Sequence, residues 1–165
     1  GVSRRTVVKG AAWAVPAVAI AGSAKAVAAS EPVVVSYGGG ACKHPGEPKW
    51  YHFIFCFDNT SAASITVSLT KMNVNGVERP TLPTSVTIPA DTELCYFVDG
   101  GLFSDSANGT ATLYYSYTYL GNLVEGDIQT SFNSLPPCGT GADPCGSTNP
   151  KSDPPHSPDP VERCF

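Results

Sequence analysis

Six cysteines and three histidines are the residues of this chain with the most distinctive chemistry. The cysteine count is even, and no two cysteines have the CxxC spacing that is typical of zinc sites. In an exported protein, such a set predicts a framework of disulfide bonds, with fifteen ways to pair six cysteines. The predicted disulfide cysteines are Cys42, Cys56, Cys95, Cys138, Cys145 and Cys164.

The histidines and carboxylates give no clear catalytic motif. His44 falls in a loop rich in glycine and proline, His52 in an apolar segment and His156 in a proline-rich tail. A copper or zinc site made of His44, His52 and a carboxylate is one alternative, but we favour surface and loop histidines and expect no metal and no cofactor. Motifs such as GxSxG, HExxH and the phosphate-binding loop are absent, so we expect a protein that is not an enzyme. Aspartates that could form an acid pair lie mostly beside predicted turns, where Asp has a local structural role: Asp58, Asp91, Asp99 and Asp105.

Aromatic residues form the most suggestive candidate for a ligand surface. Tyr115, Tyr117 and Tyr119 alternate along one predicted strand and therefore share a face. Exposed, they would form a platform for stacking sugars or a patch for a protein partner. Buried, they would be ordinary core, which is the interpretation we favour. Trp50 and His52 share a face with Cys56 and offer a second candidate surface.

The first thirty residues resemble a twin-arginine export signal. Residues 3–9 (SRRTVVK) match its pattern around Arg4 and Arg5, and an apolar stretch follows over residues 10–24. This stretch is too short for a membrane span, and the small residues after it fit a signal peptidase site. The resemblance implies a signal peptide over residues 1–29, handled by the twin-arginine translocase and signal peptidase.

Charge and composition exclude nucleic acid as a partner and argue against helix. All 14 acidic residues lie at or after Glu31, and the six basic residues beyond Ala29 leave that part with a net charge of −8. Nucleic-acid binding requires clustered Lys and Arg. Only 15% of the residues are charged, and straight-chain helix formers are scarce beside Thr, Val, Ser, Tyr and Phe.

Short β-type segments separated by turn signals follow the signal. About seven of them occupy a domain over residues 30–135, which predicts an immunoglobulin-like antiparallel β-sandwich. Asn75-Gly76 is the strongest hairpin signal. The three glycines after Tyr37 predict a loop over residues 38–49. The predicted strands cover residues 32–37, 50–57, 65–74, 85–88, 93–98, 110–120 and 123–132.

Two segments resemble repeated β-sandwich domains of bacterial cell surfaces, of the kind that actinobacteria secrete. Residues 55–69 (FCFDNTSAASITVSL) resemble their strand–NT(S/G)–strand hairpin. Residues 85–98 (SVTIPADTELCYFV) are similar to their V-x-I/V-P-A-G-x-T pattern, with Asp91 where glycine is usual. The resemblance implies a fold and a surface role, not an activity.

Side-chain alternation suggests where two of the cysteines lie. Odd positions of residues 50–57 are all aromatic and should face the core, which puts Cys56 on the outer face, and the same argument puts Cys95 there. We therefore predict a Cys56–Cys95 bridge, with Cys42–Cys56 as the alternative. The tail over residues 136–165 holds three cysteines, so at least one must pair outside it if all are paired, and Cys42 is the natural partner.

Together these features predict a secreted or wall-associated, non-catalytic structural or interaction module. Its partner would be a cell-wall glycan or another surface protein, with no stable membrane span. Carbohydrate binding through Tyr115, Tyr117, Tyr119 and Trp50 is the first alternative. A metal- or cofactor-dependent extracytoplasmic enzyme is the second.

Overall fold

The computed structural model describes residues 30–44, 49–103, 108–138 and 159–161, which form an all-β domain. The predicted signal peptide, with Arg4 and Arg5, lies outside the described residues. The strands are β1 (Val33–His44), β2 (Lys49–Asn59), β3 (Ile65–Val74), β4 (Val77–Arg79), β5 (Ser85–Ile88), β6 (Thr92–Phe103), β7 (Gly109–Tyr119) and β8 (Asn122–Phe132).

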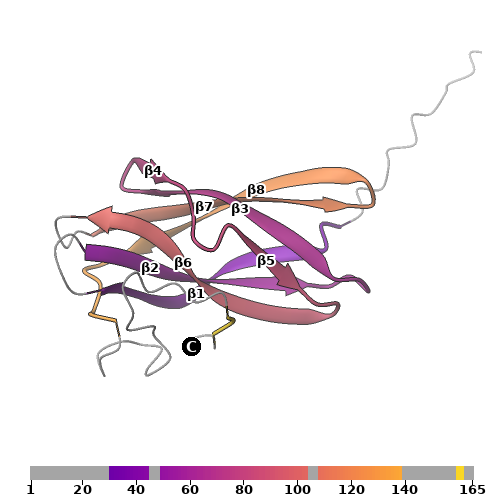
Figure 1. Ribbon diagram of the computed structural model, residues 1–165, viewed down its shortest axis with the longest axis horizontal. Helices are drawn as coiled ribbons and strands as arrows, with labels where there is room; N and C mark the ends of the chain where they lie inside the picture. Colours follow the sequence, from indigo (N-terminus) through magenta and orange to yellow (C-terminus); the bar gives the residue numbers. More distant parts are fainter. Residues whose placement is uncertain (1–29, 45–48, 104–107, 139–158, 162–165) are drawn as a thin grey trace, which may run out of the picture.

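The strands form two antiparallel sheets, which lie one above the other in Figure 1. The smaller sheet has the order β1-β2-β6. The larger has five strands in the order β4-β3-β7-β8, with β5 paired to β3 beyond the end of β4. The prediction of an all-β, two-layered domain is confirmed.

The main core lies between the sheets and follows the predicted alternation. Tyr51, Phe53, Phe55 and Phe57 of β2 are essentially inaccessible to solvent and pack in one cluster with residues of the larger sheet, such as Met72. Each such burial removes a large apolar surface from water and contributes about 1.5–3 kcal/mol. The aromatic run of β2 therefore anchors the smaller sheet to the larger one.

The prediction of a loop after Tyr37 is wrong, because β1 continues through the glycines to His44. A bulge between Tyr37 and Ala41 interrupts its pairing with β2. At Gly38 a Cβ atom would collide with the side chain of Ile54 and approach the Cys56 sulfur to 3.0 Å. Glycine is present there because the neighbouring strand fills the space, and it does not end the strand.

One predicted hairpin turn is confirmed, and another begins earlier in the sequence than predicted. Asn75 and Gly76 have φ values of 51° and 85° and join β3 to the additional short strand β4. At the end of β7 the positive φ values fall on Leu120 (49°) and Gly121 (79°), so the turn begins at Leu120, which was expected to be the last residue of the strand over residues 110–120. Asp91 also has a positive φ of 49°, consistent with its place at a position where glycine is usual in the resembled pattern.

The predicted turn after β2 is organised by one buried side chain. The Asn59 amide donates to the carbonyls of Ala63, Ile88 and Pro89 at 2.8–3.1 Å. Its oxygen accepts hydrogen bonds from the Ser61 N–H (3.0 Å) and hydroxyl (2.7 Å). The Asn-Thr-Ser sequence thus ties β2 to the end of β5.

Two disulfides staple the smaller sheet. Cys56 and Cys95 face each other across β2 and β6 and are bonded, which confirms the predicted pair and shows the Cys42–Cys56 alternative to be wrong. Cys42 is bonded to Cys138, as expected for a link to the tail. Cys145 and Cys164 lie outside the described residues.

The outer face of the smaller sheet is covered rather than open. A second apolar cluster there contains both disulfides with Ile54, Phe97 and the partly buried Val161. The tail lies along both edges of this sheet, since the N–H of Cys138 donates to the Lys43 carbonyl at 2.8 Å and that of Val161 to the Cys95 carbonyl at 2.7 Å. His52, expected on an open surface, is consequently only 2% exposed.

Candidate ligand-binding site

The predicted tyrosine strip faces the interior of the sandwich. Tyr117 is 3% exposed and belongs to the main core, while Tyr115 and Tyr119 are partly buried against it. Burial raises the pKa of the Tyr115 and Tyr117 phenols. The strip therefore does not present three open rings, as a sugar platform would require.

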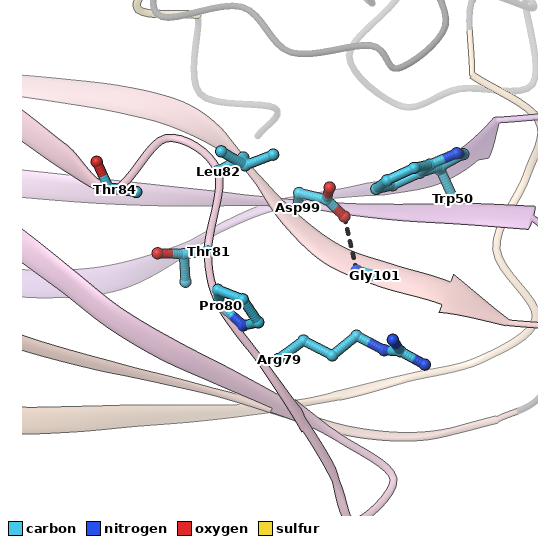
Figure 2. A pocket seen from close by; sticks show the side chains of 8 residues that line it. All are labelled: Trp50, Arg79, Pro80, Thr81, Leu82, Thr84, Asp99 and Gly101. Carbon is cyan, nitrogen blue, oxygen red and sulfur yellow. Dashed lines mark hydrogen bonds between the residues drawn. The ribbon is translucent and has the colours of Figure 1, made fainter.

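Trp50, the fourth predicted ligand residue, lines a pocket that the strip does not reach. The pocket has a volume of about 320 Å³, within the range of small-molecule sites. Figure 2 shows it between β2, β6 and the segment that leads from β4 to β5. Its lining residues are Trp50, Arg79, Pro80, Thr81, Leu82, Thr84, Asp99 and Gly101.

Hydrogen bonds to both sheets hold the wall formed by residues 80–84. The Thr81 hydroxyl, which is buried, donates to the Leu69 carbonyl of β3 at 2.7 Å. The Leu69 N–H donates to the Thr84 carbonyl at 2.8 Å, and the Asp99 N–H of β6 donates to the Leu82 carbonyl at 2.8 Å. This segment bridges the two sheets, so the pocket is largely preformed and ligand binding would order little backbone.

Asp99 supplies a carboxylate to the pocket from a buried position in β6. The residue is 4% exposed, and one carboxylate oxygen accepts the Gly101 N–H at 2.6 Å (Figure 2). Burial raises the pKa of Asp99 to about 6, although this hydrogen bond and the nearby positive charge of Arg79 act in the opposite direction. Near neutral pH the group is therefore a charged acceptor held in a poorly solvated place.

Gly101 allows Arg79 to lie beside that carboxylate. A Cβ atom on Gly101 would collide with the Arg79 side chain, and the φ of Gly101 is 97°, a value that favours glycine. The backbone thus bends at the point where the arginine packs, and the pocket combines a donor-only guanidinium with an acceptor-only carboxylate.

Of the residues that line this pocket, the sequence patterns identified only Trp50 as a ligand candidate. Asp99 was expected beside a turn, yet it lies within β6, on the face that carries Glu93, Cys95 and Phe97. Continuing the alternation past Val98 could have placed it. Nothing local marks Arg79, which comes near Asp99 only because the two sheets pack against each other: β4 belongs to the larger sheet and β6 to the smaller one.

Metal ligation finds no support among the described side chains. The three potential ligands that come together there are Cys56, Glu93 and Cys95, and the two sulfurs are joined in a disulfide, so neither is a thiolate. Of the alternative site made of His44, His52 and a carboxylate, the His44 side chain lies outside the described part of the structure, as does His156.

No protein-family model matches the chain, and no curated protein is similar to it in sequence. In the described part of the chain, no helix has the length and apolar character needed to cross a membrane.

Proposed function

We propose that this protein is a secreted or wall-associated, non-catalytic binding module of the immunoglobulin-like β-sandwich type, exported by the twin-arginine route. Its ligand enters the pocket between Trp50, Arg79 and Asp99. The observation that carries the proposal is that this pocket is built from both sheets and fastened by hydrogen bonds to each.

The disulfides support the cellular location. Cys42–Cys138 and Cys56–Cys95 are disulfide bonds of the kind that form and persist in oxidising environments, and they therefore support an extracytoplasmic location. The twin-arginine resemblance of residues 3–9 agrees with this location.

The pocket chemistry favours binding over catalysis. Asp99 is the one carboxyl group among the described lining residues, whereas glycoside hydrolysis commonly uses two. The Thr81 hydroxyl is engaged with the Leu69 carbonyl, and neither a histidine nor a cysteine lines the described pocket to activate a nucleophile.

Co-sedimentation of the oxidised full chain with purified bacterial cell walls tests this function. We expect binding by the unaltered protein and its loss in Trp50→Ala. Two control variants lie outside the pocket: Leu123→Ala changes a side chain that is 66% exposed on β8, and Tyr119→Ala changes the tyrosine strip. Both controls should bind.

Two results would contradict the proposal. Binding that is retained in Trp50→Ala but lost in Tyr119→Ala would place recognition on the tyrosine strip. Absence of binding by the unaltered protein would refute the association with the wall.

A further inference from the structure

The pocket also indicates a class of ligand, an inference that rests on the proposed function. Its charged lining, among the described residues, consists of one carboxylate, Asp99, and one guanidinium, Arg79. The two charges act on each other, because Arg79 pulls the pKa of Asp99 downward. A ligand with one net charge would be attracted by one of these two groups and repelled by the other, so its charge gains little here, and a neutral ligand that can hydrogen-bond to both groups suits the pair.

A purely apolar ligand fits less well. Asp99 is only 4% exposed and has little contact with solvent. A hydrocarbon placed beside it would remove the remaining water without supplying a hydrogen bond. A hydroxyl group both donates and accepts, so neighbouring hydroxyls can add hydrogen bonds to the acceptor-only carboxylate and to the donor-only guanidinium, beside the partners that these groups already have.

The remaining walls provide an apolar surface. The indole of Trp50 lies on one side of the Asp99 carboxylate and the side chain of Leu82 on the other, with Pro80 farther along the wall (Figure 2). An aromatic ring of this kind packs against a flat face of C–H groups. A ring with an apolar face and a hydroxylated rim therefore matches the two halves of the lining.

We propose that the pocket binds one neutral pyranose unit of a glycan, with its C–H face on Trp50 and its hydroxyls shared between Asp99 and Arg79. The volume of about 320 Å³ is at the small end of ligand sites, which suits a single sugar ring better than a longer segment.

Tryptophan fluorescence provides a direct test, because the chain has two tryptophans, Trp13 and Trp50. In an otherwise unaltered chain carrying Trp13→Phe, Trp50 is the only reporter. The probes are glucose, galactose, mannose and N-acetylglucosamine, with glucosamine as a cationic and glucuronate as an anionic comparison. We expect a saturable change with at least one neutral sugar, a dissociation constant on the order of 1 mM for so small a ligand, and binding at least fivefold weaker for the charged analogue of that sugar type.

Matched variants separate recognition from folding. Asp99→Asn, in the same Trp13→Phe chain, should weaken sugar binding about tenfold or more, because the carboxylate is a stronger acceptor than an amide. Asp127→Asn removes an exposed acid on β8 and should leave binding unchanged. Urea unfolding of each variant verifies that it is folded.

Failure of the sugar assignment can be distinguished from failure of the proposed binding function. If only a charged probe perturbs Trp50, with glycerol-matched buffer as the blank, the pocket is a binding site and the sugar assignment is wrong. If none of the probes perturbs Trp50, the sugar assignment is wrong as well. If cell walls bind but Trp50→Ala has no effect on that binding, the proposed function of the pocket fails and the sugar assignment fails with it. Equal weakening by Asp99→Asn and Asp127→Asn would also overturn the sugar assignment.

Discussion

Replacing Asp99 by asparagine should stabilise the protein at neutral pH and leave it nearly unchanged in acid. The pKa of Asp99 is raised by burial from 3.8 to about 6 in the folded protein. Because this pKa lies above the unfolded value, the folded state retains the proton between pH 4 and 6, and stability falls as the pH rises through that range. A difference of about two pKa units corresponds to about 3 kcal/mol lost above pH 7, of which about 2.5 kcal/mol develops between pH 4 and 7.5.

Asparagine removes this ionisation and still offers an oxygen to the Gly101 N–H. The assay is urea unfolding of the unaltered chain and Asp99→Asn at several pH values from 4 to 7.5. We expect the stability difference in favour of Asp99→Asn to grow by about 2.5 kcal/mol across this range. Among the described residues, the charged and titratable groups near Asp99 are Arg79 and, in register on β2, His52, so the pair of proteins is repeated with His52→Gln.

Two outcomes would refute this reasoning. A stability difference that does not change with pH would mean that the buried carboxyl is not destabilised by its surroundings. A difference that moves in favour of the unaltered chain as the pH rises would mean that Arg79 stabilises the carboxylate by more than burial costs.

Three further changes test the scaffold by urea unfolding. Replacing Cys42 and Cys138 together by alanine should lower the free energy of unfolding by about 5 kcal/mol in the chain-entropy model, because 96 residues separate the two cysteines. An unchanged free energy of unfolding would contradict the role assigned to this bond. Gly101→Ala should destabilise by more than Gly76→Ala, because both sites have φ near 90° but only Gly101 lies against Arg79; equal costs would show that this contact is unimportant. Leu120→Asn should stabilise by about 0.5–1 kcal/mol, because Asn tolerates the φ of 49° better than an exposed leucine, and a loss of stability would indicate that Leu120 has a packing role.

Sequence reasoning succeeds in this chain where a pattern is local and regular. Alternation in β2 identifies its core face because successive side chains of a strand point to opposite sides. The same alternation in β6 places Cys95 on the outer face, where Cys56 of β2 also lies. The two strands are neighbours in the sheet, and the cysteines are bonded. The Asn75-Gly76 hairpin follows from two residues that tolerate positive φ.

It fails where the deciding contact is distant. Gly38 looks like a loop residue until Ile54 of the next strand is seen to occupy its side-chain space. Likewise, His52 is predicted at an open surface, but it is buried beside the ring of Phe97 on β6 and is the register partner of Cys42, which is disulfide-bonded to the tail. In both cases the local residue types are correctly understood, and the missing information is what packs against them.

The pocket shows the same limit, because the three residues that we propose for ligand recognition come from separate strands. Trp50 and Asp99 lie on β2 and β6, and Arg79 ends β4, which belongs to the other sheet. Measuring stability and sugar binding in the same Asp99→Asn variant connects the pocket with function. A variant that gains stability and loses binding would mean that the buried carboxylate trades folding free energy for recognition, as strained functional groups often do. A variant that gains stability and binds as before would mean that Asp99 destabilises the fold and has no part in recognition. Trp50 and Arg79 would then be the residues that bind the ligand.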